Sequence, residues 1–169
     1  NNLGNVFKEL KQDDAAIQSY KKALVINPDY VESQYSLGSI FQELGQFESA
    51  IKCYEKVLVI KPNFAEMQNN LGVVFQKAGK WNAALERFQK ALVIKPDFAE
   101  AYNNLGNVFK ELQQDDAAIQ SYKKALVINP QYVESQYSLG NIFQELGQFE
   151  SAIKCYEKVL VIKPNFAEM

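Results

Sequence analysis

Histidine is absent from this sequence of 169 residues. Its absence removes the commonest general base, the Ser/His and Cys/His nucleophile systems and the commonest zinc ligand. Only Cys53 and Cys155 could supply a thiolate. They occupy equivalent positions of two nearly identical segments, so the repetition itself explains their spacing, and a reducing, cytoplasmic compartment is a simpler interpretation than a disulfide. The sequence therefore predicts no enzyme, no metal site and no cofactor.

Long apolar runs and an excess of one charge are also absent. No apolar run approaches the roughly 20 residues that cross a bilayer. Eighteen basic residues against 20 acidic ones leave a formal charge of −2. This balance does not provide the excess of positive charge that binds nucleic acid or an anionic membrane. We therefore expect neither of them as a partner. Because the chain begins at Asn1 and not at an initiator Met, we also expect it to be a fragment.

The sequence does contain a unit of 34 residues that recurs five times. Three residue types keep this spacing along the whole chain: Gly4, Gly38, Gly72, Gly106 and Gly140; Ala16, Ala50, Ala84, Ala118 and Ala152; and Pro28, Pro62, Pro96, Pro130 and Pro164. Within a unit, apolar residues follow helical spacing, as Leu71, Val74 and Phe75 do at i, i+3 and i+4. Gly79 can end a first helix in the left-handed conformation, and Pro96 ends a second one. The pattern predicts helix–turn–helix units.

This unit resembles the tetratricopeptide repeat. In the third unit the residues that carry the resemblance are Leu71, Gly72, Phe75, Ala84, Phe88, Ala91 and Pro96. The resemblance implies an all-α, right-handed superhelical solenoid of stacked antiparallel helix pairs, whose first helices line a concave groove. We expect a single array over residues 1–169, with repeats at about 1–30 (truncated at its start), 31–64, 65–98, 99–132 and 133–166, and the start of a further helix at 167–169.

The groove positions of the first helices form the predicted peptide-binding site. Asn2, Asn70 and Asn104 match the asparagine ladder of O-linked N-acetylglucosamine transferase arrays, with Ser36 and Ser138 as interruptions. An asparagine carboxamide both donates and accepts, so it can pair with peptide backbone of any sequence; the alternative is that these asparagines are merely solvated. The neighbouring groove positions complete the predicted site: Asn5, Glu32, Tyr35, Asn69, Asn103, Asn107, Tyr137 and Asn141. The groove positions hold many glutamates and few lysines, which favours a neutral or basic peptide.

A longer repeat is superimposed on the short one. Residues 1–67 and 103–169 differ at only three positions, Lys11/Gln113, Asp29/Gln131 and Ser39/Asn141. Either a very recent duplication or the concatenation of a three-repeat block explains this identity.

We expect a protein–protein interaction scaffold that binds an extended peptide or a partner helix in the concave groove. One alternative is an engineered or recently duplicated array with no native ligand. Another is the substrate-recruiting region of a larger glycosyltransferase. Because neither end carries a polar capping helix, we also expect head-to-tail self-association.

Three local expectations follow from the same pattern. Capping boxes are expected at Asp29 with Glu32, Asn63 with Glu66, Asp97 with Glu100, and Asn165 with Glu168. Lys11 and Gln113 stand where other units have the turn glycine, so these two turns are expected to be the less stable ones. Val25 and its equivalents near the end of each second helix are expected to be partly buried, or else to form an outer apolar stripe for a second partner.

Overall fold

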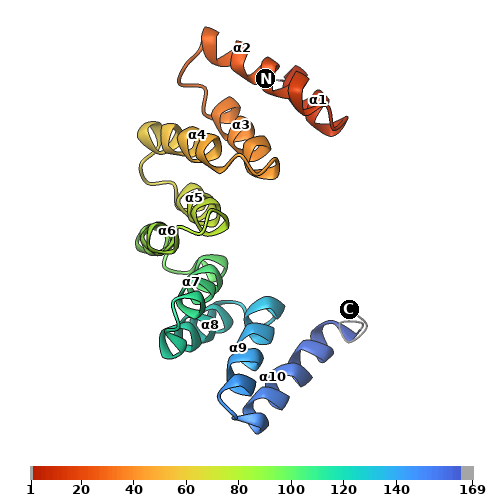
Figure 1. Ribbon diagram of the computed structural model, residues 1–169, viewed down its shortest axis with the longest axis vertical. Coiled ribbons are helices and arrows are strands. Elements are labelled where there is room, and N and C mark those ends of the chain that lie inside the picture. The colour runs from red at the N-terminus through yellow and green to blue at the C-terminus, as the bar shows by residue number, and fades with distance from the viewer. Residues whose placement is uncertain (1, 165–169) are drawn as a thin grey trace. The chain divides into compact units, whose positions relative to one another are not determined.

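Ten α-helices make up the described part of the chain, residues 2–164 of a computed structural model, and no strand occurs among these residues (Figure 1). The helices are α1 (Asn2–Glu9), α2 (Asp13–Ile26), α3 (Val31–Glu43), α4 (Phe47–Ile60), α5 (Ala65–Lys77), α6 (Trp81–Ile94), α7 (Ala99–Glu111), α8 (Asp115–Ile128), α9 (Val133–Glu145) and α10 (Phe149–Ile162). The predicted all-α class is confirmed. The further helix expected at 167–169 lies outside the described residues.

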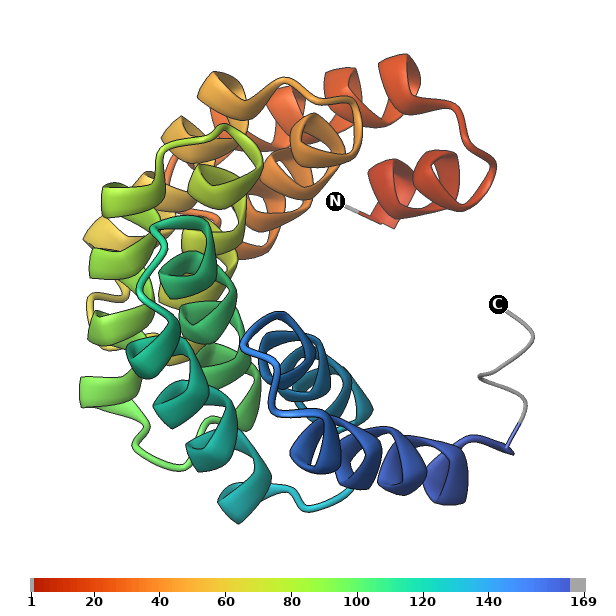
Figure 2. The same ribbon diagram turned by 60° about the horizontal axis from the view of Figure 1, so that its bottom comes forward.

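The chain forms two compact units, Asn1–Ala83 and Ala84–Met169, which meet inside the first turn of α6. In unit 1, α1 packs on α2 and α3 on α4 as hairpins, while α2 also contacts α3 and α4 contacts α5. In unit 2, α7 packs on α8 and α9 on α10, and α8 contacts α9 (Figure 2). Within each unit, one hairpin therefore buries a second face against the helix that follows it, as a solenoid requires.

A tyrosine packs over a glycine in four of the described hairpins, α1–α2, α3–α4, α7–α8 and α9–α10. A Cβ atom added at Gly38 would lie 2.5 Å from Cε1 of Tyr54, and one added at Gly106 would lie 2.6 Å from Cε1 of Tyr122. The same pairing joins Gly4 with Tyr20 and Gly140 with Tyr156. Only glycine leaves room for the ring, so the recurring glycine has a packing reason and is more than a turn signal.

The turns inside the hairpins share one left-handed geometry, whether or not they carry glycine. Gly45 has a φ of 70°, Lys11 one of 55° and Gln113 one of 58°. In the first hairpin, the N–H groups of Lys11 and Gln12 donate to the carbonyls of Lys8 and Phe7, which closes a Schellman motif. Lys11 and Gln113 thus have the left-handed conformation, and the lower stability expected of their two turns stays a prediction.

Replacing Lys11 by Gly should raise the free energy of unfolding by about 1 kcal/mol, because a side chain in the left-handed region costs roughly that amount and glycine avoids it. Urea denaturation followed by circular dichroism measures the change. The matched control is Gly45→Lys, where no atom lies within 4 Å of an added Cβ, so that only backbone strain is added and stability should fall by a similar amount. A lower stability of Lys11→Gly would contradict the prediction.

The predicted capping boxes are wrong where the structure describes them. The N-cap residues of α3, α5 and α7 are Tyr30, Phe64 and Phe98, and none of these helices has a side-chain cap hydrogen bond. Each helix begins after an aromatic residue that is half-buried, so burial of the aromatic residue determines the entry of the chain, and the Asp or Asn before it lies outside the cap. The box expected at Asn165 with Glu168 lies outside the described residues.

The prediction that the valines near the ends of the second helices are partly buried is also wrong. The exposed fractions of these side chains lie between 80% and 83% at Val25, Val59, Val93, Val127 and Val161. Leu58, directly before Val59, is only 9% exposed, so the valine lies on the side of the helix that faces away from its neighbours.

Candidate functional site

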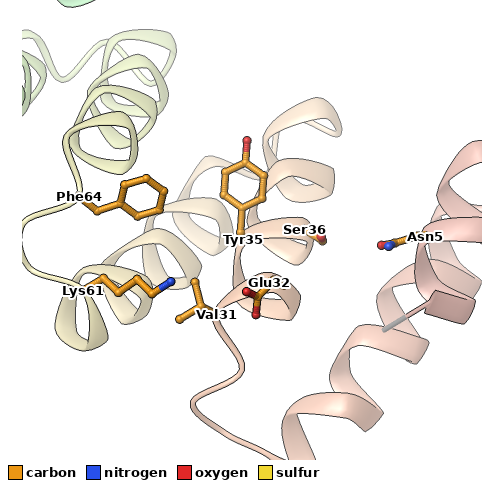
Figure 3. A pocket seen from close by; sticks show the side chains of 7 residues that line it. All are labelled: Asn5, Val31, Glu32, Tyr35, Ser36, Lys61 and Phe64. Carbon is orange, nitrogen blue, oxygen red and sulfur yellow. The ribbon is translucent and has the colours of Figure 1, made fainter. Parts of the chain in front are cut away.

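A pocket of 420 Å³ opens on unit 1, between α1, α3 and the turn that joins α4 to α5 (Figure 3). Its lining is mostly apolar and consists of Asn5, Val31, Glu32, Tyr35, Ser36, Lys61 and Phe64. Four of these seven, Asn5, Glu32, Tyr35 and Ser36, belong to the predicted groove set. The structure thus brings together, in one cavity, predicted residues from the first helices of two neighbouring repeats.

The helical period of α3 arranges one wall of the pocket. Val31 and Tyr35 are four residues apart, as are Glu32 and Ser36, so both pairs lie on one side of the helix. The ring of Tyr35 is 41% exposed and stacks on Tyr54 with centroids 6.0 Å apart. Figure 3 shows the side chain of Phe64 extending toward that of Tyr35, and both line the pocket. The pocket can therefore take an apolar group between aromatic surfaces.

Polar groups stand at the edge of this apolar surface. Asn5 on α1 faces Ser36 on α3 across a gap (Figure 3). The phenol of Tyr20 donates a hydrogen bond to Oδ1 of Asn5 at 2.7 Å. The amide NH₂ of Asn5, the second lone pair of its Oδ1 and the hydroxyl of Ser36 can therefore serve a ligand.

The same tyrosine–asparagine bond recurs in unit 2. The phenol of Tyr122 donates to Oδ1 of Asn107 at 2.7 Å, and that of Tyr156 donates to Oδ1 of Asn141 at 2.8 Å. Burial raises the pKa of Tyr122 to about 12, so its phenol remains a donor at neutral pH. In unit 1 Ser39 replaces the asparagine, and Tyr54 donates to Gln42 instead, at 3.3 Å.

Ion pairs with lysines neutralise Glu43 and Glu145, two of the glutamates at the groove positions. Nζ of Lys8 lies 2.9 Å from Oε1 of Glu43, and this hydrogen bond lowers the pKa of the carboxyl. In unit 2, Lys110 pairs with Glu145, which raises the pKa of the lysine. Glu32 is exposed and takes part in no ion pair among residues 2–164. The acidic character of the pocket therefore rests on Glu32, with the ammonium of Lys61 on the opposite wall.

Asn69 and Asn103 do not belong to an open groove, which corrects their assignment to the peptide site. They are only 1% and 6% exposed, and Oδ1 of Asn103 accepts a hydrogen bond from Ser135 at 2.9 Å. Both stand at the position that Tyr35 and Tyr137 occupy in other repeats. A short polar side chain is covered there by a neighbouring helix, whereas the longer tyrosine reaches the surface.

The other predicted positions keep contact with solvent. Asn2 is exposed, Tyr137 is 41% exposed, and three are half-buried: Asn70, Asn104 and Ser138. Three pocket residues were missed, namely Val31, Lys61 and Phe64. Lys61 and Phe64 lie in a turn between two helices, where helical periodicity carries no information about facing, so no sequence signal could have found them.

The two cysteines and the acidic side chains are the remaining candidates for reactive and metal-binding groups. Cys53 and Cys155 are free and buried, and burial raises the pKa of the Cys53 thiol to about 11, so this sulfur is a poor nucleophile. Within residues 2–164, no cluster of acidic and cysteine side chains could hold a metal ion. None of the described helices is long and apolar enough to cross a membrane.

Comparison with known proteins identifies the repeats. Models of the TPR repeat match residues 4–45, 38–79, 76–113 and 106–147, and one of the tetratricopeptide repeat matches 133–166. No curated protein matches the chain.

Solved structures share the fold along nearly the whole chain. A crystal structure of MamA is 28% identical, with 99% of this chain and 98% of that chain covered and a TM-score of 0.88. MamA from Desulfovibrio magneticus RS-1 is 21% identical, with 98% and 93% covered and a TM-score of 0.87. YrrB, described as a TPR protein with an unusual peptide-binding site, is 20% identical, with 98% and 86% covered and a TM-score of 0.77. With repeat matches running from residue 4 to residue 166 of a solenoid of helix pairs, this chain belongs to the tetratricopeptide repeat family.

Proposed function

We propose that the unit 1 pocket holds an apolar side chain of an extended peptide, so that this repeat scaffold acts as a peptide-binding module. The observation that carries the proposal is the pocket itself: a cavity of side-chain size with aromatic walls and a polar edge. TPR proteins are generally non-catalytic scaffolds for protein interactions. YrrB, which shares the fold, is described as having a peptide-binding site, and this supports the class of ligand.

The apolar wall, the polar edge and Glu32 each make a separate contribution to peptide binding in this proposal. Burying a leucine-sized side chain against Tyr35 and Phe64 contributes about 1.5–3 kcal/mol. The NH₂ group of Asn5 and the hydroxyl of Ser36 pair with the carbonyl and N–H groups of the peptide backbone. Glu32 attracts a basic residue beside the apolar one, and this effect falls as salt is added because the carboxylate is exposed.

A panel of capped hexapeptides tests these contributions by isothermal titration calorimetry. The peptides carry Leu, Phe or Ser at one central position and Lys or Glu next to it. Leu and Phe should bind at least about tenfold more tightly than Ser, the equivalent of about 1.4 kcal/mol. Tyr35→Ala should weaken binding of the Leu peptide by about tenfold or more. Glu32→Gln should remove only the preference for Lys over Glu.

The control is Val25→Ala, which removes an exposed side chain that does not line the pocket and should leave affinity unchanged. Circular dichroism must show the same helix content in every variant. Failure of all the peptides to bind would contradict the proposal, and so would an unchanged affinity in Tyr35→Ala.

The other expectations remain predictions. An asparagine ladder would use Asn70 and Asn104, which are half-buried. The described contacts test none of four further expectations: a partner helix as ligand, an array without native ligand, a region of a larger glycosyltransferase, and head-to-tail self-association.

A further inference from the structure

We infer that unit 2 carries a second copy of the unit 1 pocket, formed by Asn107, Val133, Glu134, Tyr137, Ser138 and Lys163, and that it binds the same class of peptide. The chain would then be bivalent. This inference rests on the proposed function of unit 1, and it adds a second site and a stoichiometry.

Every residue that lines the unit 1 pocket recurs unchanged 102 positions later. The seventh, Phe166, lies outside the described residues. The 34-residue period does not preserve the set: Asn69 and Asn103 replace the tyrosine, and both are buried. The set of seven thus follows the longer repeat, and the chain holds two copies of it.

The described surroundings of the second set resemble those of the first, although the planes of Tyr137 and Tyr156 make an angle of 49° and those of Tyr35 and Tyr54 one of 27°. Tyr137 is 41% exposed, as Tyr35 is, and its ring centroid lies 5.9 Å from that of Tyr156, against 6.0 Å for Tyr35 and Tyr54. Tyr137 therefore presents the same fraction of its side chain, beside the same neighbouring ring.

The polar edge is also reproduced. Asn107 accepts the hydrogen bond of the Tyr122 phenol, as Asn5 accepts that of Tyr20, and both bonds measure 2.7 Å. Ser138 is half-buried, as Ser36 is. The asparagine thus keeps its tyrosine partner in both units, although Asn107 is half-buried and Asn5 is exposed.

The lysine wall has the same backbone. Lys61 caps α4 with φ −126° and ψ 79°, and Lys163 caps α10 with φ −131° and ψ 87°. The N–H of each donates 2.8 Å to a valine carbonyl, that of Val57 for Lys61 and that of Val159 for Lys163. The backbone therefore leaves both helices in the same direction at the lysine.

Two differences should make the second site the weaker one. Val133 is only 4% exposed, whereas Val31 is half-buried, so the second wall offers less apolar surface to a ligand. Gln131 stands where unit 1 has Asp29, which removes one negative charge two residues before the valine. We expect a Lys-containing peptide to fill the unit 1 site first.

Calorimetry with the capped Leu hexapeptide that carries an adjacent Lys tests the inference on the full chain. The expected stoichiometry is two peptides per chain. Tyr35→Ala should leave one site of the weaker affinity, Tyr137→Ala one site of the tighter affinity, and the double variant none. If an alanine variant loses helix content, Glu32→Lys and Glu134→Lys replace it, because both glutamates are exposed, and each should weaken only its own site.

The outcomes separate this inference from the proposed function. One peptide per chain, lost in Tyr35→Ala and retained in Tyr137→Ala, would overturn the second site and leave the first intact. Two peptides per chain that both survive Tyr137→Ala would place the second site elsewhere and overturn the inference as well. No binding of the hexapeptide to the wild-type chain would overturn both proposals.

Discussion

Truncation of Tyr122 to Ala should lower the free energy of unfolding by about 3–5 kcal/mol, the usual cost of removing a buried aromatic side chain. Only 2% of Tyr122 is exposed, and its ring fills the space above Gly106. Ala118, Ile119 and Leu139 belong to the same buried cluster, so several neighbours lose contacts when the ring is removed. Removal of the phenol also leaves Oδ1 of Asn107 without its hydrogen-bond donor.

Tyr122→Phe separates the ring from its hydroxyl. This variant keeps the packing over Gly106 and removes only the hydrogen bond to Asn107, so it should cost about 1 kcal/mol. Urea denaturation followed by circular dichroism measures both variants, with a fit that allows for stepwise unfolding of repeats. The comparison variant is Tyr137→Ala, which removes a tyrosine that is 41% exposed and should therefore cost much less than Tyr122→Ala. Equal losses in Tyr122→Ala and Tyr137→Ala would contradict the role of burial.

Gly106→Ala should destabilise the protein by about 1–3 kcal/mol, as overpacking of a close contact does. Its new Cβ would lie 2.6 Å from Cε1 of Tyr122 and 2.7 Å from Cδ1. The ring is buried and cannot rotate into solvent, so the two helices must separate. This cost opposes helix propensity, on which Ala is favoured over Gly by about 1 kcal/mol.

The sign of this effect should reverse when the ring is removed. In a Tyr122→Ala background, the three atoms that lie nearest to the added Cβ are gone, and Gly106→Ala should then stabilise by up to about 1 kcal/mol through helix propensity. A double-mutant cycle measures the difference between the two backgrounds. If Gly106→Ala destabilised both backgrounds equally, the contact with Tyr122 would not be the reason for the glycine.

Four of the seven residues that line the candidate pocket could be predicted from the sequence. Glu32, Tyr35 and Ser36 lie on a first helix whose period of 3.6 residues decides which side each of them takes. Asn5 follows from the same register in the preceding repeat. Lys61 and Phe64 could not be predicted, because they join the pocket through the path of a turn, and that path depends on how α4 and α5 pack.

The sequence by itself determined the helices, their pairing and the left-handed turns at Lys11 and Gln113. These features depend on residues close together in the chain, and five copies of one period make the local pattern unmistakable. Tertiary structure alone decided which polar side chains face solvent. Asn69 and Asn103 have the same chemistry as Asn70 and Asn104, yet they are buried, because one residue of helical rotation turns a side chain by about 100° toward a neighbouring helix. The aromatic N-caps were decided in the same way, since burial of Tyr30 or Phe98 against other parts of the fold outweighs one capping hydrogen bond of about 1 kcal/mol.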